Sequence, residues 1–484
     1  MAPAGGCGQL QIDHAIAGLF AVDGQCIPGV TRGLALSSSI VATEATKGPQ
    51  ASTPGVGSGG ETVVMKFGGT SVAGPEDLKR AAARIVAERQ RGNKVVAVLS
   101  ARGKTTDELL TMATEISDSP SPREMDMLLS TGERISCALC AMAIWDLGHQ
   151  AISLTGSQAG IVTDSSHTKA RIVDVRAGRI EQALERDNIV LVAGFQGVST
   201  DSKDVTTLGR GGSDTTAVAL AAALGASVCE IYTDVAGVFS ADPRVVPDAR
   251  KLPVVSFEEM LEMAASGARV LQLRSVEYAR NHGVRIHCRS SFEQGTGTLV
   301  IAEEETMENP FVTAVTHSAD EARVTLSGVR NEPGIAGRIF TALADANVNV
   351  DVIIQNEPVS TEHGADLSFT VGRADLATAV AAIEGEDGMS SGKILTDDQI
   401  GKVSIIGAGM RSHPGVAAKV FQVLGDEGIN IEMISTSPIK ISCVIAADRV
   451  DDAVRALHGA FELGADTIHE EDSTGEHKAR AASR

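Results

Sequence analysis

Short apolar segments alternate with helical patterns from residue 61 onward, and this alternation limits the possible fold more than any other feature. Segments 63–67, 94–100 and 189–195 are apolar almost throughout. A strand without a polar face must be covered on both faces, as in parallel sheets flanked by helices. The sequence therefore predicts a mostly parallel sheet between helical layers, with ligands bound beyond the carboxyl ends of the strands.

Length and charge exclude several classes of protein. The 484 residues suffice for about two to four domains. A net charge of −20 argues against a sequence-independent grip on nucleic acid or anionic lipid. No apolar run approaches the about 18–20 residues of a membrane span, and seven scattered cysteines indicate a reduced setting. We expect a cytoplasmic protein without a nucleic-acid or membrane partner.

An internal repeat occupies the C-terminal part at a constant offset of 81 residues. Pro333-Gly334 recurs as Pro414-Gly415, and Asn349 recurs as Asn430. Each copy reads as a βαββαβ unit with an open sheet face, and two copies can pack together and bury it. The first 60 residues have a linker-like Gly, Ser, Thr and Ala composition. The predicted domains are a disordered extension (1–60), an α/β domain (61–305), two βαββαβ units (320–395 and 402–470) and a flexible tail (471–484).

Two glycine-rich segments have the chemistry of phosphate binding. Lys66-Phe-Gly-Gly69 places a lysine at a strand end and two glycines at the turn, where consecutive N–H groups can face an anion. Gly209-Arg-Gly-Gly212 precedes a predicted helix, with Ser213 and Asp214 as capping candidates. An ordinary turn explains the first segment as well, and a capped helix after a flexible loop explains the second. A Walker-type loop is missing from the sequence.

Two other short patterns have ordinary explanations. Cys137 and Cys140 form C-x-x-C inside an apolar helical stretch, and core cysteines are the better interpretation. Thr131-Gly-Glu-Arg134 places an acid and a base on one helix, which an ordinary surface ion pair explains at even odds.

Six segments taken together, in this order, resemble the aspartate kinase (aspartokinase) family. They are Lys66-Phe-Gly-Gly-Thr70, Ser100-Ala-Arg-Gly103, Thr131-Gly-Glu-Arg134, Gly194-Phe-Gln-Gly197, Thr207-Leu-Gly-Arg-Gly-Gly-Ser-Asp214 and Tyr232-Thr-Asp234. The resemblance covers about residues 61–463 and is strongest to actinobacterial members. It implies a three-layer α/β/α amino-acid-kinase sandwich with a mostly parallel sheet, followed by two ACT (βαββαβ, ferredoxin-like) regulatory domains.

The resemblance also implies an activity and a set of site residues. The activity is ATP-dependent phosphorylation of the L-aspartate β-carboxylate, the first step toward lysine, threonine, methionine and diaminopimelate. The implied catalytic residues are Lys66, Arg210 and Asp234. Aspartate would be held by Ser100, Thr106, Glu133, Arg210 and Ser213, with Glu133 on its α-ammonium group. ATP would be bound by Lys66, Phe67, Gly68, Gly69, Gly211, Gly212, Thr233, Asp234, Phe239, Asp242, Arg244 and Arg269. Mg²⁺ would be held mainly by the nucleotide, without a metal site of the protein's own.

Three residues depart from the wording expected of the family. Arg102 stands where a methionine is usual, Phe239 replaces a common tyrosine, and Arg269 replaces a lysine that reaches toward ATP. Arginine keeps the charge of lysine but not its geometry.

The ACT pair implies feedback inhibition by lysine, threonine or both. The implied effector site consists of Asn331, Pro333, Gly334, Ile335, Asn349, Gln355, Asn356, His413, Pro414, Gly415, Val416 and Asn430. A homo-oligomer, or a complex with separate ACT-only subunits, would also follow. Two alternatives stay open: a kinase for another carboxylate, such as acetylglutamate or glutamate, and a non-catalytic amino-acid sensor.

Overall fold

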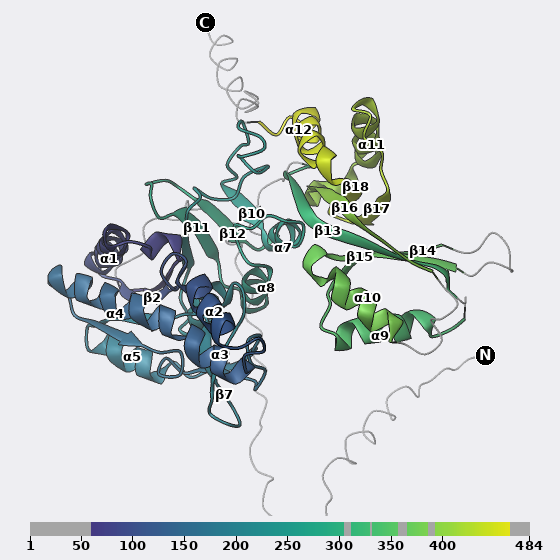
Figure 1. The fold of residues 1–484 in the computed structure, drawn as a ribbon. Coiled ribbons are helices and arrows are strands. Elements are labelled where there is room, and N and C mark those ends of the chain that lie inside the picture. Colours follow the sequence, from purple (N-terminus) through teal and green to yellow (C-terminus); the bar gives the residue numbers. More distant parts are fainter. Residues whose placement is uncertain (1–59, 304–310, 330–331, 357–364, 386–392, 465–484) are drawn as a thin grey trace, which may run out of the picture. The chain divides into compact units, whose positions relative to one another are not determined.

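The computed structural model describes residues 60–303, 311–329, 332–356, 365–385 and 393–464 (Figure 1), all within one compact unit, Gly57–Arg484. The predicted extension (1–60, except its last residue), the predicted tail (471–484) and Asn331 lie outside the described residues.

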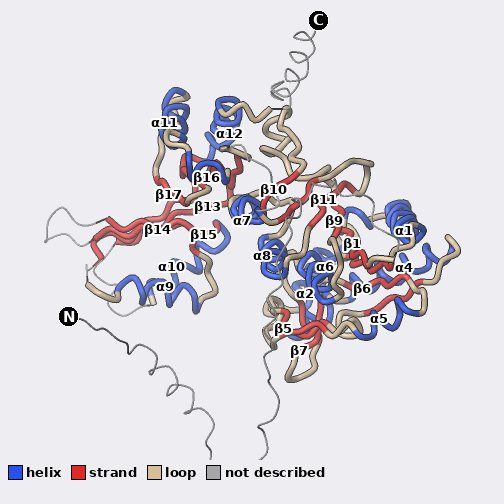
Figure 2. Tube along the Cα trace, turned by 180° about the vertical axis from the view of Figure 1, so that it is seen from behind, coloured by secondary structure: helices blue, strands red, loops and turns tan. Residues whose placement is uncertain are grey.

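The N-terminal part of the described chain is built on an eight-stranded sheet with the order β10-β12-β11-β9-β1-β2-β6-β3. Its strands are β1 (Thr62–Phe67), β2 (Lys94–Leu99), β3 (Ala151–Leu154), β6 (Ile189–Ala193), β9 (Cys229–Thr233), β10 (Val254–Ser256), β11 (Ile286–Ser290) and β12 (Thr298–Ile301). Every neighbouring pair is parallel except β11–β12. Figure 2 shows β11, β9, β1 and β6 along the sheet. The prediction of a mostly parallel sheet is confirmed.

Helices cover both faces of this sheet because its strands are apolar on both faces. They are α1 (Pro75–Gln90), α2 (Thr105–Ile116), α3 (Pro122–Leu129), α4 (Thr131–Asp146), α5 (Gly178–Glu185), α6 (Gly212–Ala223), α7 (Phe257–Ala265) and α8 (Leu273–His282). Along β1, Met65 and Phe67 pack with α1 and α4, whereas Val64 packs with α6. Residues alternate across a strand, so Lys66 lies on the α6 face.

The two helices α3 and α4 together span Pro122–Asp146, a stretch of 25 residues that is long and apolar enough to cross a membrane by length and composition alone. The sequence-based statement that no stretch approaches this length is therefore wrong. Cys137, Cys140 and Ile144 of α4 are packed in the core against β1 and β2, which is the behaviour of a core helix. The prediction of core cysteines is confirmed.

A second, four-stranded sheet stands beside the main one, in the order β5-β4-β7-β8. It consists of β4 (Ile161–Thr163), β5 (Ile172–Val175), β7 (Gln196–Ser199) and β8 (Val205–Thr207). The sequence predicts a helix over 173–186, but the helix begins at Gly178 because the preceding residues pair with β4. Strand β8 leads directly into the glycine-rich segment before α6.

The repeat forms one six-stranded antiparallel sheet, β14-β15-β13-β16-β18-β17. Its elements are β13 (Ala314–Val329), α9 (Ile335–Asp345), β14 (Val350–Asn356), β15 (Ala365–Gly372), α10 (Leu376–Glu384), β16 (Lys393–Ile406), α11 (Val416–Asp426), β17 (Met433–Ser437), β18 (Lys440–Ala446) and α12 (Val450–Ala460). Helices α9 and α11 have 11 residues each and start directly after Gly334 and Gly415, which are left-handed at φ 95° and 100°. The repeat predicted from the sequence is thus present in the fold.

The two copies join edge to edge through β13 and β16 rather than face to face. Residues 323–327 of β13 pair with 393–397 of β16, and residues 314–318 pair with 402–406. The second copy is therefore completed by strand residues that precede the first copy. The boundaries 320–395 and 402–470 stay predictions. Each copy pairs with strand residues that lie outside its own predicted boundaries.

Candidate active site

Four central strands end level with one another at one edge of the main sheet. Phe67 of β1 pairs with Leu99 of β2 and with Tyr232 of β9, and Leu99 pairs with Ala193 of β6. The residues that follow these strands therefore form one continuous edge. Of the predicted site residues, Gly68 and Gly69 follow β1, Ser100 follows β2, and Asp234 follows β9.

Lys66 joins the two glycine-rich segments. Its ammonium group lies 2.5 Å from the carboxylate of Asp214, and the two side chains are only 11% and 7% exposed. A Cβ atom added to Gly68 would lie 3.6 Å from Lys66 Nζ. Because Asp214 is in the first turn of α6, the Lys66 amine and the 209–214 turn share one site.

Asp214 was predicted to cap α6, together with Ser213, and that prediction is wrong. The helix starts at Gly212, its N-cap is Gly211, and no side chain caps it. Gly211 is left-handed, with φ 73°, a conformation that glycine adopts without strain. The amides of the first turn are therefore not covered by a capping side chain, and the positive end of the helix dipole faces the strand edge.

The loops after β1 and β2 are hydrogen-bonded to each other and packed closely together. The N–H of Gly103 donates to the carbonyl of Gly69 at 2.9 Å, and a Cβ on Gly69 would lie 2.8 Å from the carbonyl oxygen of Ala101. The Arg102 guanidinium donates to the Ala73 carbonyl at 2.7 Å. The departure at Arg102 therefore does not point into the strand edge but ties the two loops together.

Glu133 is a buried carboxyl group with an unused oxygen. Its side chain lies in the first turn of α4, and the residue is 3% exposed. One oxygen accepts the N–H of Ala101 at 3.2 Å, while Oε2 has no hydrogen-bond partner among the described residues. Burial raises the pKa of Glu133 to about 7, against the opposing effect of its backbone hydrogen bonds and of Arg134. The surface ion pair considered for this segment is wrong.

Arg134 is directed away from Glu133 toward other partners. Its guanidinium donates to Gln196 Oε1 at 3.2 Å and to Ser130 Oγ at 3.0 Å. The Glu133 carboxyl group therefore has no cationic side chain bound to it among the described residues, and it could bind a cationic group of a ligand.

The remaining residues predicted to bind aspartate lie directly after β2, at the start of α2 and at the start of α6. Ser100 follows β2 and is half-buried, as is Thr106 in the first turn of α2. Ser213 is buried, and its Oγ would lie 2.8 Å from a Cβ on Gly194, so Gly194 leaves it room. Arg210 is exposed in the loop before α6. Hydroxyl groups, one carboxyl group and one guanidinium group are the chemistry that a zwitterionic amino acid requires.

The residues predicted on the nucleotide side are only partly brought together. Thr233 Oγ1 donates to the exposed Asp234 at 3.0 Å. The paired Asp242 carboxylate, 2.6 Å from the Arg244 guanidinium, raises the pKa of Arg244, and Asp234 acts in the same direction.

Two predicted nucleotide residues lie differently from that group. Phe239 packs against the apolar cluster that includes β16 and β18 rather than turning toward the strand edge. Arg269 is exposed in the segment between α7 and α8. Gln272, three residues later, packs closely against Gly211: its Cγ would lie 2.2 Å from a Cβ atom added to Gly211.

A buried ionic network lies beneath the strand edge and was missed from the sequence. Burial alone would raise the pKa of Glu230, but His287, Arg289 and Tyr232 outweigh it and lower that pKa to about 2. The Tyr232 ring stacks on Phe67 at 4.8 Å. This network lies on the last residues of β9 and beside the end of β1. Its only signal in the sequence is a charged residue within an otherwise apolar strand.

The predicted effector residues lie at two equivalent places in the repeat. Asn349, Gln355, Asn356, His413 and Asn430 are exposed, as are both Pro-Gly pairs. Ile335 and Val416 are buried core residues at the first turns of α9 and α11. Their side chains therefore support the loops, and only their backbones could face a ligand.

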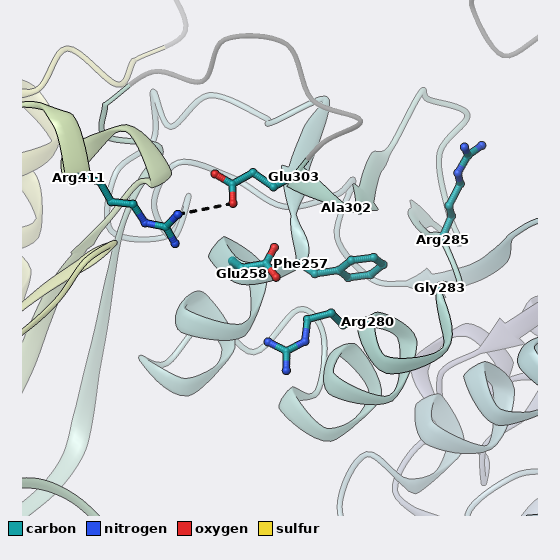
Figure 3. A pocket seen from close by; sticks show the side chains of 8 residues that line it. All are labelled: Phe257, Glu258, Arg280, Gly283, Arg285, Ala302, Glu303 and Arg411. Carbon is teal, nitrogen blue, oxygen red and sulfur yellow. Dashed lines mark ion pairs between the residues drawn. The ribbon is translucent and has the colours of Figure 1, made fainter. Parts of the chain in front are cut away.

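A cavity of about 450 Å³ elsewhere contains none of the predicted site residues. Phe257, Glu258, Arg280, Gly283, Arg285, Ala302, Glu303 and Arg411 line it. In Figure 3 Arg280 and Arg285 point in different directions, and Arg411 pairs with Glu303 at 3.8 Å. The arginines do not converge on a common anion site.

Comparisons with known proteins agree with this geometry. Residues 61–290 match the amino acid kinase family, and residues 324–386 and 403–461 match the ACT domain. An aspartokinase of Mycolicibacterium smegmatis is 57% identical over 409 residues, which are 84% of this chain and 97% of that protein.

Solved structures are similar over the same part of the chain. Aspartokinase III of E. coli in complex with aspartate and ADP (R-state) has a TM-score of 0.72 and 26% identity, over 83% of this chain and 99% of that one. The same enzyme in complex with lysine and aspartate (T-state) has a TM-score of 0.64 and 25% identity, over 82% and 99%.

Proposed function

Because the chain belongs to the aspartokinases of the amino acid kinase family, we propose that it transfers the γ-phosphoryl group of ATP to the β-carboxylate of L-aspartate. A bond forms between a carboxylate oxygen and the γ-phosphorus, and the bond from that phosphorus to the β,γ-bridging oxygen breaks. The products are 4-phospho-L-aspartate and ADP. The observation that carries the proposal is the shared site of Lys66 and the α6 N-terminus, beside the buried, half-paired Glu133.

The reaction needs no general base; it needs the two substrates placed in line and their negative charges offset. An aspartate β-carboxylate is ionised at neutral pH, with a pKa of about 3.9. Two anions must nevertheless approach in line, so fixed donors and cations have to offset their repulsion. Lys66, held by Asp214, and the N–H group of Gly69 are such groups. The N–H groups of Gly68 and Gly212 already donate to the carbonyls of Tyr232 at 3.2 Å and of Gly209 at 3.0 Å.

Aspartate would be recognised through both of its termini. The free oxygen of Glu133 would accept the α-ammonium group, and Arg210 would pair with a carboxylate. The hydroxyls of Ser100, Thr106 and Ser213 would complete the set. A carboxyl with a pKa of about 7 keeps enough ionised form at neutral pH to bind a cation.

The nucleotide side would be formed by Thr233, Asp234, Asp242 and Arg244, with Mg²⁺ supplied on the phosphates. Among the described residues no three His, Cys, Asp or Glu side chains converge on a metal position. Phe239 and Arg269 have the weakest claim to contact ATP, given where their side chains lie.

A turnover assay with three acceptors separates this proposal from its alternatives. ATP consumption is followed with aspartate, glutamate or acetylglutamate, and hydroxylamine traps the acyl phosphate as a hydroxamate. We expect turnover and hydroxamate with aspartate, and at least about 100-fold lower kcat/KM with the others. Preference for another acceptor would support a different carboxylate kinase, and no turnover with any of them would support a sensor.

We also propose that the enzyme catalyses the first step of a biosynthetic pathway and that the repeat regulates it by binding lysine, threonine or both. The support is the pair of equivalent helix starts at Gly334 and Gly415, together with the exposed asparagines Asn349 and Asn430, which follow the ends of α9 and α11. A free amino acid's carboxylate suits such a start. A coupling of about 1–3 kcal/mol to the inactive arrangement is enough for inhibition.

Asn349→Ala and Asn430→Ala are expected to weaken inhibition without changing basal turnover. We expect the concentration of lysine or threonine for half inhibition to rise about 5–20-fold, the loss of one or two hydrogen bonds. Gln422→Ala, at another exposed polar position of the second copy, is the matched control and should leave inhibition unchanged. Unaltered inhibition in both asparagine variants would refute the assignment.

Deleting the repeat is a poorer test of regulation. Ala241, Val246 and Ala249 of the catalytic part belong to one apolar cluster with residues of β16, α11 and α12. Deletion would expose them, so loss of inhibition could reflect misfolding.

For the assembly we propose a homo-oligomer, or a complex with ACT-only subunits, in the cytoplasm. Ile353 of β14 and Ile434 of β17, which are equivalent in the repeat, are exposed to 50% and 43% on the two outer strands of the sheet. The five described cysteines are all free and buried, which suits a reducing compartment. Sedimentation of the wild type and of Ile353→Lys tests the assembly, and the variant should dissociate.

A further inference from the structure

Asp126 is a fully buried carboxyl group outside the proposed catalytic and binding residues. It lies on α3 and is 0% exposed. Its Oδ1 accepts the Thr207 hydroxyl at 2.5 Å and the Thr168 N–H at 3.1 Å, and its Oδ2 lies 2.7 Å from His167 Nδ1. Burying a carboxyl without such partners would be strongly unfavourable. The complete set of partners indicates a built, specific junction.

We define residues 208–212 as the glycine loop. Two of the Asp126 partners, Thr207 and Thr168, lie at the start of this loop and against it. Thr207 is the last residue of β8, so its hydroxyl bond to Asp126 fixes the point where the loop begins. Thr168 has a left-handed backbone with φ 66°, and its carbonyl would lie 3.2 Å from a Cβ on Gly209. Asp126 therefore holds both the start of the loop and the segment that packs against it.

Arg274 of α8 also binds the start of the glycine loop and the segment that packs against it. Its guanidinium donates to the carbonyls of Leu208 at 2.9 Å and Ala170 at 2.8 Å. The loop entrance is thus fixed from two elements, and Asp126 is the anchor that comes from α3.

Helix α3 also leads directly to the opposite side of the site. Only Ser130 separates it from α4, whose first turn carries Glu133. The Ser130 carbonyl accepts the Gln196 side-chain amide at 2.8 Å, which ties this junction to β7. One short helical segment therefore carries the anchor of the glycine loop at Asp126 and leads to the aspartate-binding carboxyl at Glu133.

We propose that Asp126 is a positioning residue that fixes the glycine loop relative to Glu133 through the Thr207 hydroxyl and the Thr168 N–H. This inference rests on the proposed function, since the loop is taken to hold the transferring phosphoryl group. Displacements of about 1 Å in such a site can lower rates about 100-fold. Loosening the anchor should therefore impair the use of ATP and also the binding of aspartate, because the loop carries Arg210.

Neighbouring threonines supply a matched experiment. Thr207→Val removes the hydroxyl that reaches Asp126, Thr207→Ser keeps it, and Thr206→Val removes a hydroxyl bond of 2.6 Å to Thr163 at an equally buried position of the same strand. We expect Thr207→Val to lower kcat/KM for ATP about tenfold and to raise KM for aspartate as well, because Arg210 lies in the loop. Thr207→Ser should recover both constants to within about threefold of wild type, and Thr206→Val should leave both constants at their wild-type values.

Amide hydrogen exchange gives a readout that is independent of activity. In Thr207→Val and in Asp126→Asn, exchange of residues 208–214 should rise at least about tenfold, and in Thr206→Val it should not. If both valine variants change exchange and kinetics alike, or if Asp126→Asn leaves the loop protected, the inference is wrong. A wild type that phosphorylates aspartate while Thr207→Val behaves normally would overturn this inference alone, whereas a wild type without that activity would overturn the proposed function.

Discussion

Lys66→Ala is expected to lower kcat by about 1,000-fold, the largest effect of any single substitution in the site. Lysine is the one cation that lies both beside Gly68 and against the first turn of α6 among the described residues. Removing a preorganised donor from a charge-stabilising site costs about 100–1,000-fold in kcat, and here a full positive charge between two anions is lost as well. Steady-state turnover at saturating ATP and aspartate measures the effect.

Lost activity must be separated from lost stability, because Lys66→Ala leaves Asp214 buried without its partner. Breaking one side of such a pair costs about 3–5 kcal/mol in the free energy of unfolding. The double variant Lys66→Ala/Asp214→Asn removes the orphaned charge and should recover most of that stability, but not the rate. A double variant that turns over within about tenfold of wild type would contradict the role of Lys66.

Glu133→Gln is expected to raise KM for aspartate about 30-fold or more. The amide keeps the size of the carboxyl but cannot form the charged hydrogen bond to the α-ammonium group, which is worth about 2 kcal/mol or more when desolvated. For the wild type, KM for aspartate should rise as the pH falls below about 7, because protonation then neutralises Glu133. Initial rates between pH 6 and 8.5 measure both effects.

The same substitution should stabilise the fold, with a pH dependence of known sign. Burial raises the pKa of Glu133 from 4.5 to about 7, so folding favours the protonated form and the ionised form weakens the fold. The free energy of unfolding should therefore rise in Glu133→Gln by up to about 3 kcal/mol at pH 8, and hardly at all at pH 4.5.

Glu88→Gln is the control for this stability gain. Glu88 is also buried, but its carboxylate is paired with Arg91 and Asn93, each at 2.5 Å. That variant should lose stability at pH 8 rather than gain it. Equal changes at pH 4.5 and pH 8 in Glu133→Gln would show that the buried charge is not the cause.

Local sequence signals predict the elements whose ends are set by local chemistry. Pro75 opens α1, and the two Pro-Gly pairs open α9 and α11, because proline fits the first turn and glycine adopts the left-handed cap. The apolar strands likewise predict a sheet that is covered on both faces. These features depend on residues that are close in the chain.

Features that depend on distant partners could not be predicted. Asp214 looks like a capping residue until β1 places Lys66 against it, and Glu133 looks like a surface acid until α4 is packed over the β2 loop. The start of α5 depends on pairing between β4 and β5. The sharing of β13 between the two copies depends on strand order, which the periodicity of one strand does not encode.

The most direct measurement is a crystal structure of the protein with aspartate and a non-hydrolysable ATP analogue. We predict that the terminal phosphate lies within about 3 Å of both Lys66 Nζ and an N–H of the α6 first turn, with the aspartate α-ammonium group on Glu133. Phosphates bound elsewhere, for example at the cavity lined by Arg280 and Arg411, with Lys66 still closed on Asp214 alone, would contradict the account.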